Sequence, residues 1–135
     1  MLKMKVLVVG PPALAQIIGH LFRECPELEV VGTMAGLRNL TRNAERLLPE
    51  LIVATVKPVG TDVGKHVTSI KRCSPSSRLI LVCPIPEFMG KARSSGADAF
   101  LDQEQLVSRL VPTVLALVGQ QSPEHTSSHR QPVCR

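Results

Sequence analysis

Five short apolar runs recur along the chain, each bounded by glycine, proline or polar residues. Three of them are continuous, namely Lys5–Val9 (KVLVV), Leu51–Val56 (LIVATV) and Arg78–Cys83 (RLILVC). Such runs, rich in β-branched residues, are typical of strands buried on both faces of a sheet. Two shorter strands are predicted at Glu29–Val31, ended by the glycine that follows, and at Ala99–Leu101.

The segments between these runs carry apolar residues at the spacing of a helix. From Leu14 to Phe22 they recur at i, i+3, i+4, i+7 and i+8, which predicts a helix with one buried stripe that ends before Pro26. Asp62 is a favourable N-cap for a helix in the middle of the chain. The other predicted helices are Leu37–Leu48, a short one near Phe88–Ser94, and Glu104–Val118.

The last predicted helix contains a proline, which conflicts with its otherwise regular pattern. Pro112 lacks an amide donor and its ring crowds the preceding turn, at a cost of about 3 kcal/mol in a helix interior. We therefore predict a kink or a break there, or else a shorter final helix. The apolar side chains expected to face inward are Leu106, Val107, Leu110, Val111, Val114 and Leu115.

The strict alternation of predicted strands and helices indicates an α/β fold. Elements in this order form a parallel sheet that helices cover on both faces. One domain is expected to span residues 1–118, and the polar, proline-containing residues 119–135 are predicted to form a disordered tail. In open sheets of this kind, ligands bind at the carboxyl ends of the strands.

Composition narrows the classes of function. The 135 residues carry a net charge of +5, but the basic residues are scattered and no Trp or Tyr is present, so we interpret the charges as solvated helix faces and expect no nucleic-acid binding. No apolar run approaches the roughly 20 residues of a membrane span, and the first residues do not resemble a signal peptide. Four cysteines without a CxxC pair argue against a zinc site or disulfide framework and suit a reducing cytoplasm.

Five longer segments, which include the predicted strands, follow one another at a characteristic spacing. They are KVLVVGPPAL (5–14), PELEVVGTMAG (26–36), LLPELIVATVKPVGTDVG (47–64), SSRLILVC (76–83) and SSGADAFLDQEQL (94–106). Together they resemble the CheY-like receiver domain of bacterial response regulators over residues 3–118. The resemblance implies a flavodoxin-like, doubly wound, five-stranded parallel sheet with strand order 2-1-3-4-5. The second segment is most similar to the subgroup that often carries a DNA-binding helix-turn-helix.

The resemblance also implies which positions would carry chemistry, and there the residues depart from the family. The acidic pair that holds Mg²⁺ aligns with Gly10 and Pro11, and the phosphorylated aspartate aligns with Thr55. The switch serine or threonine aligns with Cys83, and the lysine that contacts the phosphoryl group aligns with Gln103. Mg²⁺ prefers carboxylate oxygens, and phosphoryl transfer depends on neutralising charge. We therefore expect a degenerate phosphorylation pocket without a catalytic residue, a metal or a cofactor.

The leading hypothesis is a pseudo-receiver, a non-enzymatic signalling module that binds a protein partner, or a second copy of itself, without phosphorylation. In the family, such contacts commonly lie on the surface made by the fourth helix, the fifth strand and the fifth helix. The resemblance therefore implies a candidate interaction face made of Phe88, Met89, Phe100, Gln105 and Arg109.

Three other functions stay open at the level of the sequence. A small-ligand-binding regulatory domain would use Thr55, Cys83 and Gln103 as a relic pocket, although the chain has no glycine-rich phosphate-binding motif. A DNA-binding-type response regulator reduced to its receiver follows from the subgroup resemblance. An enzyme of another class on the same fold has no supporting group of residues, and His20 and His66 are interpreted as surface histidines.

Overall fold

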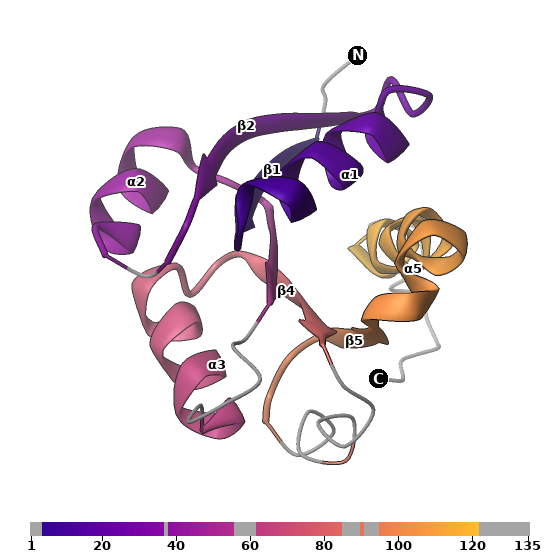
Figure 1. Ribbon diagram of the computed structural model, residues 1–135. Coiled ribbons are helices and arrows are strands. Elements are labelled where there is room, and N and C mark those ends of the chain that lie inside the picture. The colour runs from indigo at the N-terminus through magenta and orange to yellow at the C-terminus, as the bar shows by residue number, and fades with distance from the viewer. Residues whose placement is uncertain (1–3, 37, 56–61, 85–89, 91–94, 122–135) are drawn as a thin grey trace.

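Five parallel strands form one sheet in the order β2-β1-β3-β4-β5 (Figure 1), which confirms the predicted architecture. The computed structural model describes residues 4–36, 38–55, 62–84, 90 and 95–121. The strands are β1 (Met4–Val9), β2 (Leu28–Met34), β3 (Leu51–Thr55), β4 (Arg78–Cys83) and β5 (Ala99–Asp102). The helices in this part of the chain are α1 (Pro12–Phe22), α2 (Leu40–Leu47), α3 (Val63–Cys73) and α5 (Leu106–Gln121), with the 3-10 turn η1 (Gln103–Gln105) before α5.

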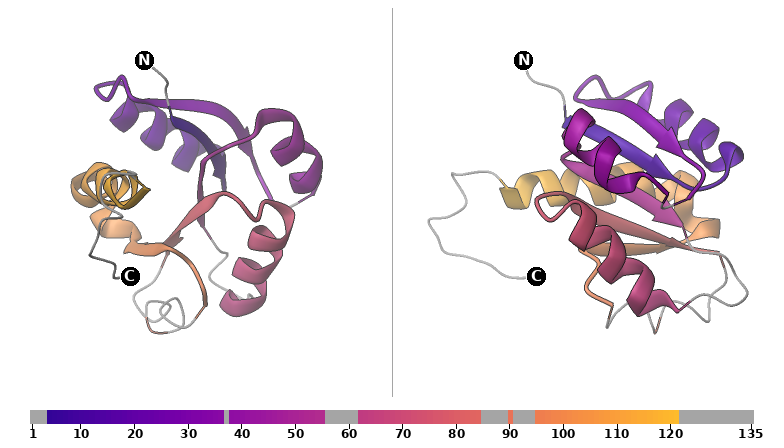
Figure 2. Two further views of the ribbon diagram at one scale, coloured as in Figure 1. Left: turned by 180° about the vertical axis from the view of Figure 1, so that it is seen from behind. Right: turned by 90° about the vertical axis from the view of Figure 1, so that its left-hand side faces the viewer.

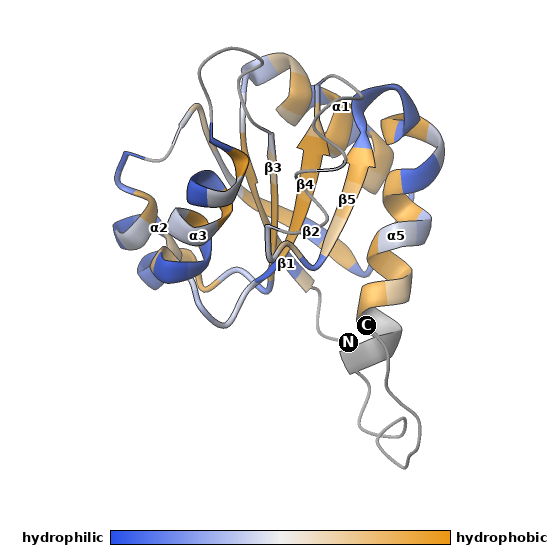
Figure 3. Ribbon diagram, turned by 90° about the horizontal axis from the view of Figure 1, so that it is seen from below, coloured by the Kyte–Doolittle hydropathy of each residue, from blue (hydrophilic) through white to orange (hydrophobic). Residues whose placement is uncertain are grey.

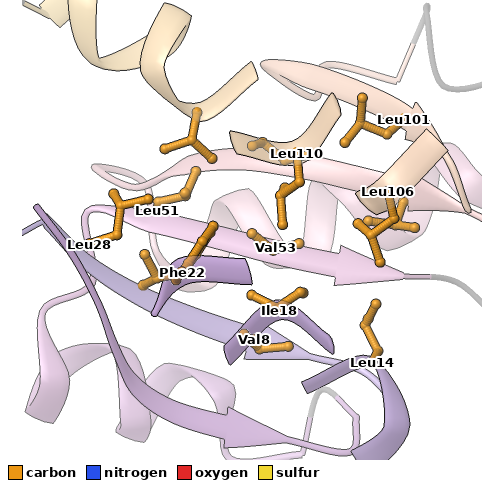
Figure 4. Packing of buried hydrophobic residues seen from close by; sticks show 14 of the residues in the cluster. Val8, Leu14, Ile18, Phe22, Leu28, Leu51, Val53, Leu101, Leu106 and Leu110 are labelled. Atoms are coloured by element: carbon orange, nitrogen blue, oxygen red, sulfur yellow. The ribbon is translucent and has the colours of Figure 1, made fainter. Parts of the chain in front are cut away.

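Successive residues of the central strands enter two separate hydrophobic cores, because side chains alternate across a sheet. Val8 and Val53 lie on the side covered by α1 and α5, whereas Leu7 and Ile52 lie on the side covered by α2 and α3. Figure 2 shows the two helix layers, and Figure 4 shows Ile18 of α1 packed near Val8. This double coverage explains why the strands read as continuous apolar runs.

Strand β2 is longer than predicted, and Gly32 lies inside it rather than at its end. The glycine pairs with Leu7 of β1, just past an irregularity in the register. A Cβ atom at Gly32 would lie 2.8 Å from Cδ1 of Leu47, so the glycine lets α2 pack closely against the sheet. Helix α2 begins at Leu40, later than predicted, because Asn39 adopts a left-handed conformation with φ 65°.

Helix α5 continues through Pro112, so two of the three predicted alternatives, a break at the proline and a shorter helix, are wrong. Pro112 and Ser108, whose carbonyl loses its amide donor, both lie on the exposed side of the helix. The helix extends to Gln121, past the domain boundary predicted at residue 118, while residues 122–135 lie outside the described part. No helix among the described residues, α5 included, has the length and apolar character needed to cross a membrane.

The buried stripe of α5 differs from the predicted one at three positions. Val107 is 68% exposed and Leu115 is 49% exposed, although the apolar pattern predicts both to face inward. Leu117, absent from the predicted set, is buried. The core residues repeat at i, i+4, i+8 and i+11 along one narrow stripe, which leaves the apolar residues on its flank outside. These core residues are Leu106, Leu110, Val114 and Leu117.

Two aspartates hold α3 in place, one at each end of the helix. Asp62 caps the helix as predicted, because its Oδ1 accepts a hydrogen bond from the Lys65 amide at 3.1 Å. Asp98, in the turn before β5, accepts hydrogen bonds at Oδ2 from the Lys71 ammonium at 2.9 Å and from the Leu79 amide at 2.7 Å. The Asp98 side chain therefore joins the last turn of α3 to the start of β4.

Candidate functional site

The five residues predicted to form the pocket all lie at one edge of the sheet, where the parallel strands end. Gly10 follows β1, Thr55 ends β3, Cys83 ends β4 and Gln103 follows β5. Pro11 comes directly before α1 and acts as its N-cap residue. The fold brings Gly10 and Thr55 into contact, but Cys83 belongs to the core beneath α2 and α3, and Gln103 is exposed.

The Thr55 hydroxyl is engaged within the sheet. Its Oγ1 donates a hydrogen bond to the Val82 carbonyl at 2.9 Å, and the strand register places these two residues side by side. An ionised carboxylate at position 55 could not make this bond, because it has no proton to donate. Thr55 therefore joins β3 to β4 instead of presenting a nucleophile to solvent.

A side chain at position 10 would crowd Leu14 and Thr55. A Cβ atom there would lie 2.8 Å from Cδ2 of Leu14 and 2.9 Å from Cγ2 of Thr55, and real Cβ atoms essentially never approach a neighbour below 3.0 Å. Pro11 offers no amide donor, and its carbonyl accepts hydrogen bonds from the Leu14 and Ala15 amides at 3.0 and 3.3 Å. The Leu14 side chain and the Thr55 methyl group therefore close this end of β1.

Cys83 is a buried, protonated thiol. It is 0% exposed, and burial raises its pKa, as does the nearby Asp102 carboxylate that the register places beside it on β5. A thiol with a raised pKa is a poor nucleophile at neutral pH. Asp102 was not among the predicted site residues, although its position directly before Gln103 indicated that it lies at the same strand end. Its Oδ1 accepts a hydrogen bond from the Glu104 amide at 3.1 Å and so starts η1.

His66 lies near this edge and is partly buried, so the interpretation as a surface histidine is wrong. Its Nε2 atom is buried and has no hydrogen-bond partner among the described residues. Burial lowers the pKa of His66, and an interaction with the Thr55 backbone opposes this shift. The spacing of residues could have predicted this partial burial. His66 follows Val63 by three residues and precedes Ile70 by four, which places it beside the buried stripe of α3.

Acidification is expected to destabilise the fold through His66. Since its pKa in the folded chain lies below the ordinary value of 6.5, the unfolded chain binds more protons between the two values. The contribution of His66 to the free energy of unfolding is therefore complete above pH 6.5 and is lost as the pH falls through the folded pKa. Urea denaturation at about pH 7.5 and about pH 5 measures the loss.

The matched variants are His66→Gln and His20→Gln, the second at an exposed position on α1. We expect His66→Gln to lose less stability on acidification than the wild type, and His20→Gln to lose as much. Equal losses in all three proteins would show that His66 is not desolvated.

The predicted interaction face is described only in part. Gln105, at the end of η1, and Arg109, in the first turn of α5, are both exposed. Phe100 is partly buried and packs against the core beneath α2 and α3, so most of its ring is not open surface. Phe88 and Met89 lie outside the described residues.

The order of the strands and the placement of the helices define the fold of response-regulator receiver domains, which is flavodoxin-like. The isolated receiver domain of RcsB from Salmonella enterica serovar Typhimurium, solved with the phosphomimetic BeF3⁻, aligns with a TM-score of 0.73 and 17% identity, covering 89% of this chain and 91% of that one. The response regulator domain of Thermotoga maritima CheB gives a TM-score of 0.67 and 19% identity, covering 87% and 95%.

A longer structure, the RcsB response regulator of Salmonella typhimurium with the S207C substitution, gives a TM-score of 0.77 and 18% identity. The alignment covers 92% of this chain but 65% of that protein. At such identities the likeness establishes the fold alone. No protein-family model matches the sequence, and no curated protein matches it.

The residues at the strand ends do not fit the Mg²⁺ and phosphoryl site that the receiver fold implies. Mg²⁺ demands near-octahedral oxygen coordination, usually with carboxylate ligands. Gly10 and Pro11 have no side-chain oxygen, and the Thr55 hydroxyl is committed to Val82. Asp102 is then the one carboxylate among the described residues that end these strands. The described residues also contain no group of three His, Cys, Asp or Glu placed to hold a metal ion.

Proposed function

We propose that this chain is a pseudo-receiver, a cytoplasmic signalling module that binds a protein partner without being phosphorylated. The observation that carries the proposal is the Thr55 hydroxyl, which donates to the Val82 carbonyl within the sheet where the family has its phosphorylated carboxylate. The crowding that a side chain at Gly10 would meet from Thr55 and Leu14 supports it, because the family resemblance aligns the acidic pair with Gly10 and Pro11. The module acts without a cofactor, without catalysis and without a membrane or nucleic-acid ligand.

The contact surface in this proposal lies where η1 leads into α5, around Gln105 and Arg109. Both side chains are exposed, and a guanidinium group can pair with a carboxylate through two parallel hydrogen bonds. The partner there is a signalling protein or a second copy of the chain.

A second candidate is a receiver that works within a DNA-binding regulator. The observation that favours it is the likeness to RcsB, whose solved structure concerns DNA interaction. In that arrangement this domain would bind a DNA-binding segment, and α5 would still supply the binding surface.

Incubation with acetyl phosphate and Mg²⁺ is expected to leave the mass of the chain unchanged, as measured by intact-protein mass spectrometry. Addition of Mg²⁺ and then beryllofluoride is expected to shift no amide resonance near Gly10, Thr55 or Gln103. Thr55→Val is the matched control, since it keeps the shape of the side chain and removes the hydroxyl. A phosphoryl adduct on the wild type that Thr55→Val lacks would refute the proposal.

A further inference from the structure

The outward sides of α2 and α3 carry four exposed cations. Each lies two positions after a buried residue of its own helix, about 200° around the helix axis and therefore facing solvent. The two helices pack side by side on the same face of the sheet, and Figure 3 shows hydrophilic segments along both. The cations that form this α2–α3 basic face are Arg42, Arg46, Lys65 and Arg72.

Little negative charge neutralises the α2–α3 basic face. Glu45 is the one acidic residue within α2, α3 has none, and Asp62 at the N-cap of α3 is engaged with the Lys65 amide. The ion pair found among the described residues joins Lys71 to Asp98 at 2.9 Å, so none of the four cations has a carboxylate partner there. The sequence hides this concentration of charge, because α2 and α3 are separated by a strand and a loop and meet only in the fold.

Leu48 adds an exposed apolar side chain at the end of α2. It is 65% exposed, and its φ of 51° lies in the left-handed region that leucine disfavours. Glycine or asparagine usually occupies such a position at the end of a helix. Neither burial nor backbone preference therefore accounts for a leucine here, two residues after Arg46.

We propose that the α2–α3 basic face and Leu48 together bind an acidic segment of a partner protein that carries an apolar side chain. The guanidinium groups of Arg42 and Arg46 would pair with carboxylates, which suit their planar geometry. Leu48 would supply the apolar contact that excludes water beside those pairs. This inference names the chemistry of a partner and rests on the proposed binding function, but it uses a different surface from α5.

A nucleic-acid backbone would use the cations of this face but not the leucine. Phosphates are contacted by charged and polar groups, and single strands stack their bases on aromatic rings. Helices α2 and α3 contain no Phe, Tyr or Trp. The combination of arginine with an exposed leucine fits a protein segment better.

An amide NMR titration of the full chain with a synthetic peptide tests the proposal. The probe is a glutamate-rich peptide with a single central leucine, and the control peptide has serine in place of that leucine. We expect saturable shifts on α2, on α3 and at Leu48 with the first peptide, and weaker binding of the second. Binding should weaken as salt is added, because exposed charges are screened.

Three variants assign the interaction to this surface. Arg46→Glu is expected to weaken binding of the leucine peptide about fivefold, while Arg23→Glu, an equal charge change at the end of α1, stays within about twofold. Leu48→Asn is expected to weaken binding and yet to raise the melting temperature, since asparagine tolerates the left-handed conformation. Opposite effects on binding and stability would mark Leu48 as a contact residue.

Several results would overturn the inference. Shifts confined to α1 or α5, or equal binding of the leucine and serine peptides, would remove the role of the face or of Leu48. Tighter binding of a short DNA duplex than of the leucine peptide, at the same salt, would assign the face to nucleic acid. Mg²⁺ and beryllofluoride added to the same sample keep the two proposals apart, because shifts at Thr55 would refute the pseudo-receiver assignment whatever the peptide does.

Discussion

Gly10→Asp is expected to lower the free energy of unfolding by about 2–4 kcal/mol and to create no Mg²⁺ site. The new Cβ atom would lie 2.8 Å from Leu14 Cδ2 and 2.9 Å from Thr55 Cγ2, so neighbouring side chains must move. The carboxylate would also lose hydration at a crowded strand end. Urea denaturation measures the loss of stability, and isothermal titration calorimetry with Mg²⁺ tests for a site.

Two alanine variants separate crowding from charge. Gly10→Ala adds the Cβ atom alone and is expected to cost about 1–3 kcal/mol. Gly19 on α1 has nothing within 4 Å of the corresponding position. Gly19→Ala is therefore expected to stabilise the protein by about 0.5–1 kcal/mol, because alanine favours a helix interior over glycine. A Gly10→Asp variant as stable as the wild type, with saturable Mg²⁺ binding, would contradict the view that this strand end is closed.

Leu110→Ala is expected to lower the free energy of unfolding by about 2–5 kcal/mol. Leu110 is 0% exposed and lies between α5 and the sheet, in the core shared with α1 (Figure 4). Removing its side chain leaves a cavity that neighbouring side chains fill only in part. Thermal and urea denaturation both measure the effect.

Val107→Ala is the matched control on the same helix. Since Val107 is 68% exposed, the change is expected to stay within about 0.5 kcal/mol. Comparable losses of unfolding free energy in Leu110→Ala and Val107→Ala would mean that another element covers Val107. The buried stripe of α5 would then include Val107.

The strands were the most predictable part of the fold. Burial on both faces leaves an unmistakable apolar run, and Arg78–Cys83 is predicted to the residue. The helix stripe of α5 was harder, because a repeat of apolar residues does not reveal which flank another helix covers. Val107 and Leu115 illustrate this, since α1 and the sheet reach the neighbouring Leu110 but not them.

For the candidate site, the sequence indicated which positions lie at the strand ends but not which atoms they contact. The family resemblance aligned Gly10 and Thr55 with the expected chemistry, and the parallel strands do end side by side there. The bond from the Thr55 hydroxyl to Val82 depends on the register between β3 and β4, which no local pattern encodes. The environment of His66 depends in the same way on how deeply α3 packs, so the sequence alone suggested a surface residue.

The hydrogen bond between Thr55 and Val82 has a consequence for how a signal could be set. A phosphorylated protein works as a reversible switch, because gaining and losing the group biases a two-state element. As the pseudo-receiver proposed above, with the Thr55 hydroxyl held inside the sheet, this chain would have one binding-competent form, present whenever the protein is present. Its output would then follow its concentration relative to the dissociation constant of its partner. Synthesis and degradation would take the place of a kinase and a phosphatase.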